Sequence, residues 1–154
     1  MCLSACGWHL RGVGEAADDQ LLSSIQLVST SRFSRMTLAV VDALQKYGIT
    51  ETASANWQLE LKEERLEKRT VAVNSIGSAS QYELALQIDF VYRDTKVTNA
   101  LPRLQTVSTQ RVFDFDPSNT VAKAEEENQL IAEMRRELAR RIVRASSGLQ
   151  ADPY

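Results

Sequence analysis

Residues 82–92 read YELALQIDFVY, and this stretch decides the fold. Large apolar side chains occupy every second position, and mostly polar or small ones stand between them. A period of two places the apolar set on one face of an extended strand. One face of this strand is therefore expected to be buried and the other wetter, as in an antiparallel sheet covered on one side.

The residues before this strand predict its hairpin partner. Residues 57–61 (WQLEL) alternate in the same way, and strand-forming residues return at 71–73 (VAV). Between them, residues 63–70 (EERLEKRT) are strongly charged, and we interpret them as an exposed, twisted part of the strand. A short turn at 74–78 contains Gly77, and two long runs joined by such a turn are typical of a hairpin.

Two further strands and two helices complete the pattern. Residues 21–29 and 104–115 predict strands, the second rich in Thr, Val and Phe. The first helix is expected to begin at an N-cap, Ser31 or Ser34, and to bury the apolar face Phe33, Met36, Val40, Leu44 and Tyr47. The second helix is expected over 120–145, with DPSN at 116–119 ending the strand before it and capping it; its apolar stripe is Val121, Ala124, Ile131, Met134, Leu138 and Ile142.

The element order is therefore β-α-β-β-β-α. Amphipathic helices need an apolar surface to cover, and a one-sided sheet supplies it. We predict an α+β fold of two layers, in which two amphipathic helices pack on one face of a four-stranded, mostly antiparallel sheet. Residues 21–146 are expected to form this single domain, and residues 147–154 a flexible C-terminal tail.

The composition of the chain argues against several classes of function. The chain has 154 residues and a net charge of −2, which does not suit an electrostatic nucleic-acid binder. No apolar run reaches the length of a membrane span. His9 is the only histidine, and no nucleophile–base pair or set of metal ligands converges in the sequence. We expect no enzyme activity, no cofactor and no metal site.

The arginines of the second helix allow two interpretations. Five of them lie in its second half: Arg135, Arg136, Arg140, Arg141 and Arg144. Cations near a helix C-terminus interact favourably with the helix dipole, so they can simply form a solvated face. The alternative is that they hold an anionic partner, although such a series is more often a solvated face.

The N-terminal residues indicate lipidation. Residues 3–6 (LSAC) match the lipobox of bacterial lipoproteins, in which small residues admit the signal peptidase and a cysteine thiol accepts diacylglycerol. We interpret residues 1–5 as the remnant of a signal peptide, Cys6 as the lipid attachment site and residues 6–20 as the lead-in from the anchor. Several acyl chains at about 0.8 kcal/mol per buried CH₂ anchor a protein stably. Without acylation, the chain is expected to be soluble.

The sequence also resembles a known family. Residues 6–11 (CGWHLR) look like the start of a mature LptE protein, a lipopolysaccharide-assembly lipoprotein also called rare lipoprotein B. Residues 112–117 (VFDFDP), followed by Ala122, Lys123 and Glu126, are similar to that family's strand-to-helix junction. The family's fold has two helices on a four-stranded sheet, in agreement with the order above.

The resemblance implies a role without catalysis. LptE proteins are held by their lipid anchor at the periplasmic face of the outer membrane. They form a complex with the β-barrel LptD, partly inside its lumen, and assist insertion of lipopolysaccharide into the outer leaflet. Family members also bind lipopolysaccharide. The partners implied for this chain are therefore LptD, lipopolysaccharide and the outer membrane.

The resemblance also implies a binding site. In the family, a lysine early in the last helix and a basic residue near the hairpin tip are associated with lipopolysaccharide. The lysine corresponds to Lys123, whereas Ser75 occupies the tip position. Arg65, Lys68 and Arg69 lie further from the tip and are candidates to replace the missing cation. The alternative is a periplasmic ligand-binding or adaptor lipoprotein of another cell-envelope assembly, which the lipobox and the α+β pattern fit equally well.

Overall fold

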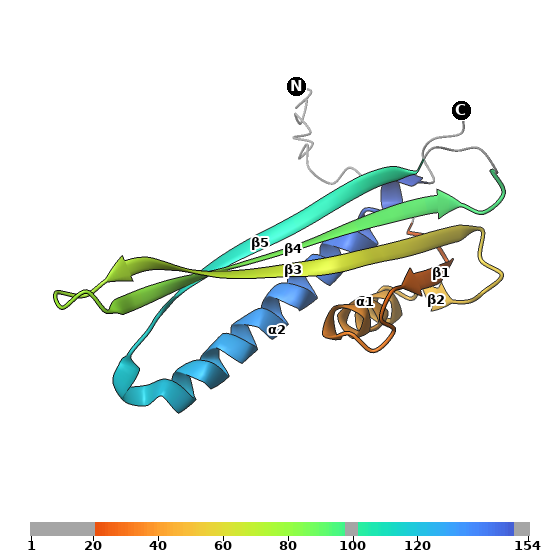
Figure 1. The fold of residues 1–154 in the computed structure, drawn as a ribbon. Helices are drawn as coiled ribbons and strands as arrows, with labels where there is room; N and C mark the ends of the chain where they lie inside the picture. The colour runs from red at the N-terminus through yellow and green to blue at the C-terminus, as the bar shows by residue number, and fades with distance from the viewer. Residues whose placement is uncertain (1–20, 98–101, 150–154) are drawn as a thin grey trace, which may run out of the picture.

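The chain folds into a five-stranded sheet with two helices on one face (Figure 1). The computed structural model describes residues 21–97 and 102–149. The elements are β1 (Ser24–Ser29), α1 (Arg35–Lys46), β2 (Thr50–Glu51), β3 (Trp57–Val73), β4 (Ala79–Asp94), β5 (Arg103–Asp114), α2 (Thr120–Arg144) and the 3-10 helices η1 (Pro117–Asn119) and η2 (Ser147–Leu149). The predicted α+β class and the helices on one face are confirmed.

The strand count was wrong by one. The sheet runs β2-β1-β3-β4-β5, and β2 is an additional strand of two residues that pairs in parallel with β1. Two residues carry no periodicity, so β2 could not be recognised in the sequence. β1 begins at Ser24, three residues later than expected, and also pairs in parallel with β3. The β3–β4 and β4–β5 pairs are antiparallel, as predicted for most of the sheet.

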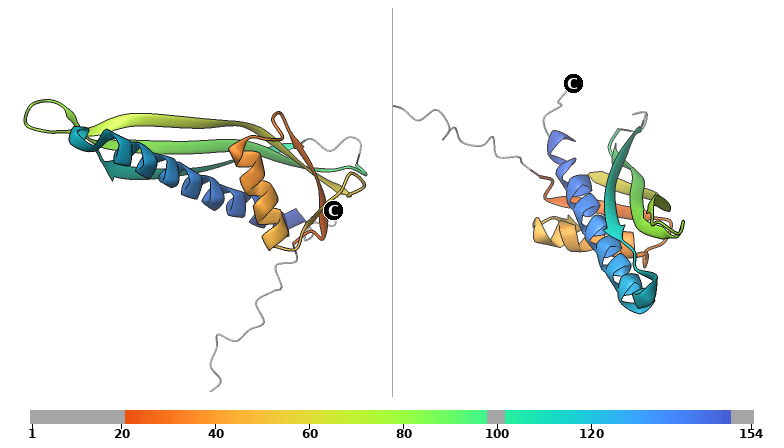
Figure 2. Two further views of the ribbon diagram at one scale, coloured as in Figure 1. Left: turned by 90° about the horizontal axis from the view of Figure 1, so that it is seen from below. Right: turned by 90° about the vertical axis from the view of Figure 1, so that its left-hand side faces the viewer.

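The predicted hairpin is the longest feature of the molecule. β3 has 17 residues and β4 has 16. In the turn, Gly77 has a φ of 80°, and the Asn74 carboxamide oxygen accepts hydrogen bonds from the backbone N–H groups of Ile76 and Ser78 at 3.1 and 3.0 Å. β1 pairs with β3 only as far as Leu61, so the distal half of β3 is a free edge. Figure 2 shows the hairpin tip reaching past the start of α2.

The hydrophobic core lies between the two helices and the face of the sheet that they cover. Met36, Val40 and Leu44 of α1 are buried, and α2 buries Ile131, Met134, Leu138 and Ile142. Phe33 was predicted on the first helix face but is 87% exposed, because Ser34 caps the helix and Phe33 precedes it. Val121 and Ala124 were predicted in the second stripe but are exposed, since the buried face of α2 starts at Ile131.

The junction before α2 differs in detail from the expectation. The Asp116 carboxylate accepts hydrogen bonds from the backbone N–H and the hydroxyl of Ser118, at 2.9 and 2.7 Å. It therefore caps η1, while Asn119 at the start of α2 makes no side-chain cap. After α2, the segment expected as a tail begins with η2, and Leu149 packs against the core. Residues 150–154 lie outside the described residues.

Candidate functional site

The candidate site lies where the first half of α2 faces the distal half of the hairpin. Lys68 of β3 pairs with Leu84 of β4, whose side chain is fully buried. Lys68 therefore projects from the helix-facing side of the sheet. Its Nζ lies 2.5 Å from Glu127 Oε2 of α2, so an ion pair joins the strand to the helix.

The Lys68 ammonium lies over two aromatic rings. Its Nζ lies 4.4 Å from the centre of the Tyr82 ring and 5.6 Å from that of Phe113. Tyr82 also contacts Phe115, with 5.1 Å between ring centres. Cation–π attraction stabilises an ammonium in this position. The site thus combines a positive charge with an apolar aromatic wall.

Lys123 supplies a second cation, in the first turns of α2. Its Nζ lies 2.8 Å from Glu126 Oε2, and its side chain is 22% exposed. Glu126 and Glu127 are neighbours in the chain, so consecutive carboxylates hold the two lysines. We call Lys68, Lys123, Glu126 and Glu127 the lysine cluster.

The positive charge of Lys123 also interacts with the Asp116 carboxylate, which precedes α2. The pKa of Asp116 is lowered, first by the hydrogen bonds from the Ser118 hydroxyl and backbone N–H and to a smaller degree by Lys123. A lysine near a helix N-terminus is unfavourable for the helix dipole. Glu126 and Asp116 offset this cost.

Arg65 and Arg69 lie on the other face of the sheet. Arg65 forms an ion pair with Asp89 of β4 at 2.8 Å, and Arg69 forms one with Glu83 at 2.6 Å. Since successive residues of a strand point to opposite faces, these guanidinium groups point away from α2. The structure therefore separates the four candidate cations. Lys123 belongs to α2 and Lys68 contacts it, whereas the two arginines lie on the opposite face of the sheet.

The hairpin tip carries no cation. Ser75 lies in the turn after Asn74, and two apolar side chains beside this turn are exposed. Val73 is 61% exposed and Ile76 is 83% exposed. At the position where the family resemblance implies a basic residue, this chain has Ser75, with exposed Val73 and Ile76 nearby.

Sequence reasoning missed two parts of the site. The sequence did not connect the acidic residues of α2 with the lysines, but Glu126 and Glu127 are the partners of Lys123 and Lys68. The aromatic wall depends on the β4–β5 register, which pairs Tyr82 with Phe113. In the sequence, the only indication of this pairing is the alternation of apolar and polar residues in the two strands.

Two further candidates belong to the N-terminal segment. Cys6 and His9 lie outside the described residues. Within residues 21–97 and 102–149, no three His, Cys, Asp or Glu side chains are placed to hold a metal ion. In that same part of the chain, neither helix is both long and apolar enough to cross a membrane.

Comparison with known sequences gives a consistent result. A family model named LptE, described as lipopolysaccharide-assembly, matches residues 22–146. The LPS-assembly lipoprotein LptE of Photorhabdus laumondii is 29% identical over 146 residues, which cover 92% of this chain and 76% of that protein.

Solved structures share the fold. The rare lipoprotein B of Shewanella oneidensis superposes with a TM-score of 0.73 at 23% identity, over 83% of this chain and 96% of that one. A lipoprotein B of Nitrosomonas europaea gives 0.70 at 18% identity, over 95% and 94% of the two chains. A minor lipoprotein of Acinetobacter baumannii gives 0.66 at 17% identity, over 84% and 94%.

Proposed function

The chain belongs to the LptE family of lipopolysaccharide-assembly proteins, and from this premise we propose that it assists insertion of lipopolysaccharide into the outer leaflet of the outer membrane. In this proposal it is a lipoprotein attached through Cys6 to the periplasmic face of that membrane. It works as a binding and assembly subunit without a reaction of its own. The family match over residues 22–146 favours this function over an adaptor of another envelope assembly.

The proposed protein partner is the β-barrel LptD. The chain would form a complex with it and lie partly inside its lumen, as the family resemblance implies. The 29% identity to a curated LptE over most of this chain supports the assignment.

We further propose that the lysine cluster binds the anionic groups of lipopolysaccharide. The observation that carries this is the position of Lys68, between a helix carboxylate and the rings of Tyr82 and Phe113. A phosphate brings more negative charge than a carboxylate, so it can displace Glu127 and Glu126 from the two lysines. The aromatic rings offer an apolar surface to the acyl part of the same ligand.

Arg65 and Arg69 remain part of the proposal as a separate contact. They lie on the outer face of the sheet, each already paired with a carboxylate of β4. A ligand must displace Asp89 or Glu83 to reach them. The lysines must also exchange a carboxylate for the ligand, but Lys68 lies beside an aromatic surface that can take up apolar parts of the ligand. We therefore expect the two arginines to contribute less to binding than the lysine cluster.

Direct binding of lipopolysaccharide to purified variants tests the cluster. Lys123→Asp and Lys68→Gln should each weaken binding by roughly tenfold, because each removes a charge-assisted contact to the ligand. Glu126→Gln combined with Glu127→Gln should strengthen binding, since it removes the competing carboxylates. The matched control is Lys96→Gln, an exposed lysine just beyond the end of β4.

Two results would contradict the assignment. Unchanged binding by both lysine variants would remove the cluster from the site. Weaker binding by the double glutamate variant would mean that these carboxylates support the ligand site and do not compete with the ligand. Circular dichroism of each variant separates lost binding from lost folding.

A further inference from the structure

Three arginines of α2 form a cationic strip beside α1. Arg136, Arg140 and Arg144 recur every four residues, so they share one helix face. Arg136 and Arg140 line a cavity of about 170 Å³ between the helices, with the small side chains of Ala39 and Ala43 among its other walls. We call the three residues the arginine strip.

The strip continues onto the end of α1. Arg144 Nε donates a hydrogen bond to the Tyr47 hydroxyl at 2.9 Å, and its guanidinium lies 6.0 Å from the centre of the Tyr47 ring. Lys46, one residue earlier, also lines the cavity. Both helices thus contribute cations to the wall of the same cavity, Lys46 from α1 and Arg136 and Arg140 from α2.

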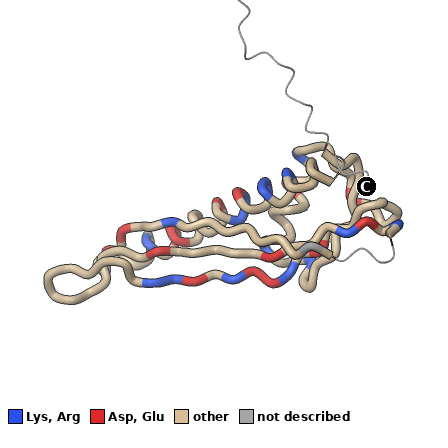
Figure 3. The backbone as a smooth tube through the Cα atoms, turned by 90° about the horizontal axis from the view of Figure 1, so that it is seen from above, with Lys and Arg blue, Asp and Glu red and all other residues tan. Residues whose placement is uncertain are grey.

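The charge of the strip is not neutralised. Among the described residues, none of the ion pairs involves Arg136, Arg140 or Arg144. The neighbouring Arg135, by contrast, pairs with Glu64. The carboxylate of Asp42 lies in the cavity wall, but it is already bound to Lys46 at 2.7 Å. Figure 3 shows Lys and Arg recurring along the turns of α2.

The strip ends close to the point where the N-terminal segment joins the fold. Three residues after Tyr47, the Thr50 N–H donates to the carbonyl of Ser23 at 3.0 Å. Leu21 packs against the same core as Tyr47. Cys6 precedes Leu21 by 15 residues, a tether of at most about 50 Å when fully extended. An acyl anchor on Cys6 would therefore hold Leu21 within about 50 Å of a bilayer, and this end of the domain is the one joined directly to the tether.

We propose that the arginine strip binds the phosphate groups of anionic phospholipids and docks this side of the domain on the leaflet that holds the anchor. The inference rests on the proposed function only in that Cys6 is the anchor. Guanidinium groups bind phosphate through paired hydrogen bonds, and basic residues near an anionic leaflet are attracted to its surface. This contact is distinct from the lysine cluster, which occupies the opposite end of α2.

Vesicle co-sedimentation tests the proposal. The full chain carrying Cys6→Ser, which has no acyl anchor, is mixed at low ionic strength with vesicles of phosphatidylglycerol and phosphatidylcholine, or of phosphatidylcholine alone. Binding is expected only with phosphatidylglycerol and should fall with added salt. Arg136→Gln combined with Arg140→Gln should weaken it by about tenfold or more. The control, Lys62→Gln with Arg93→Gln, removes the same charge around Glu60 and should bind like the parent.

Three outcomes would overturn the proposal. The double arginine variant can bind phosphatidylglycerol vesicles as tightly as its parent, or the parent can fail to bind them at all. Inorganic phosphate can compete fully at concentrations matched to the lipid, which would make free phosphate the ligand. Polyglutamate can bind through the strip while vesicles do not, which would point to an acidic protein partner.

The two proposals fail separately. Arg136→Gln with Arg140→Gln is expected to retain lipopolysaccharide binding, and Lys123→Asp is expected to retain vesicle binding. A parent chain that binds lipopolysaccharide but not phosphatidylglycerol vesicles therefore rejects the strip alone. A parent chain that binds the vesicles but not lipopolysaccharide rejects the lysine cluster alone.

Discussion

Lys68 and Arg69 are neighbours in β3, yet they face different surroundings. Lys68 meets Glu127 of the helix and two aromatic rings, whereas Arg69 meets Glu83 on the open face of the sheet. The hydrogen bond from Arg69 to Glu83 raises the pKa of the guanidinium further, so it is charged at every accessible pH. Both cations are paired with a carboxylate, so what distinguishes Lys68 is its place beside α2 and the aromatic rings around its ammonium.

Asp89 provides a test of the outer-face contacts through pH. Its pKa lies below the ordinary value of 3.8, first because Thr106 donates a hydrogen bond to the carboxylate and then because Arg65 does. In the unfolded chain the carboxyl group binds a proton at higher pH than in the folded one. The ionised group therefore stabilises the fold above its unfolded pKa, and this contribution is lost as pH falls through the folded pKa.

Asp89→Asn should accordingly lower the free energy of unfolding at neutral pH. The difference from the unmodified chain should shrink as the pH falls below about 4. Urea unfolding across this pH range measures it. A difference that stays constant down to acid pH would show that the ionised carboxylate does not stabilise the fold.

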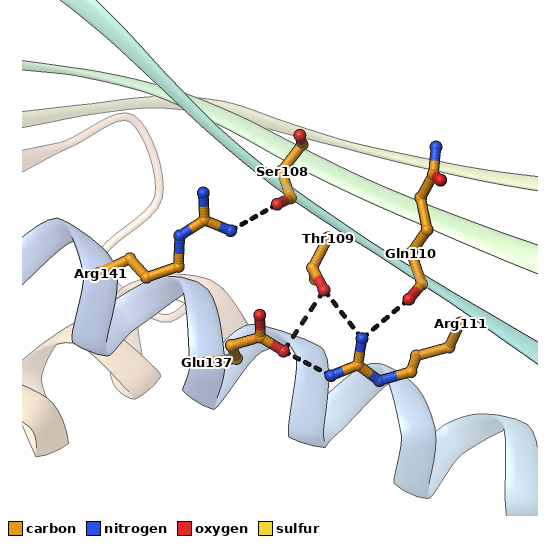
Figure 4. Close-up of polar contacts among 6 residues, drawn as sticks. All are labelled: Ser108, Thr109, Gln110, Arg111, Glu137 and Arg141. Atoms are coloured by element: carbon orange, nitrogen blue, oxygen red, sulfur yellow. Dashed lines mark hydrogen bonds and ion pairs between the residues drawn. The ribbon is translucent and has the colours of Figure 1, made fainter.

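At the level of elements, α2 protects the free edge of β5. Arg141 Nη1 donates to the Ser108 carbonyl at 2.6 Å, and Arg111 Nη1 donates to the Gln110 carbonyl at 2.8 Å (Figure 4). Glu137 holds Arg111 in place at 2.5 Å. An unprotected edge strand is a template for pairing with another chain. These arginine contacts occupy carbonyl groups that such a strand would need.

Arg141→Ala should therefore increase self-association of the chain through β5. The matched control is Arg35→Ala, which removes an exposed arginine of α1 far from this edge. Sedimentation velocity at rising protein concentration should show dimers or larger species for Arg141→Ala only. Identical profiles for both variants would mean that the arginine does not guard the edge.

The strand pattern could be predicted from the sequence, but the face of each cation in β3 could not. Residues 82–92 predicted β4 because alternation is strict and the covered face is apolar throughout. In β3, Leu59 and Leu61 face the core, and a bulge between Leu61 and Glu64 then shifts the alternation by one residue. Without this bulge, Arg65 and Arg69 would face the helices in place of Lys68. An extra residue in a charged strand leaves no mark in the hydrophobic pattern.

For the two helices, too, the sequence predicts only part of what the structure shows. Spacing alone predicted the larger buried side chains of α1 from Met36 onward and of α2 from Ile131 onward, but it missed four further buried residues: Thr37, Ala43, Ala139 and Val143. It also placed Val121 in the core, because amphipathic spacing does not say where the apolar surface beneath a helix ends. The candidate site was also predicted only in part. The family resemblance indicated Lys123, whereas the pairing of Lys123 with Glu126 and the aromatic wall were visible only in the tertiary structure.

At the scale of the whole molecule, α2 connects the two anion-binding regions that we propose. Lys123 lies in its first turns and Arg136 lies 13 residues later, which corresponds to about 20 Å along the helix axis. In our account, the first region meets lipopolysaccharide beside the distal hairpin. The second meets the membrane surface near the anchored end. The domain would then hold its ligand at a fixed distance from the leaflet to which it is tethered.

The central claim is that this chain acts as the LptE subunit of an LptD complex. The most direct measurement is the subunit ratio after co-expression of the lipidated chain with its cognate LptD and purification through a tag on LptD. Mass spectrometry of the same sample confirms acylation at Cys6. We predict that the two proteins co-purify in equal amounts. A folded, lipidated chain that never associates with LptD would contradict the account.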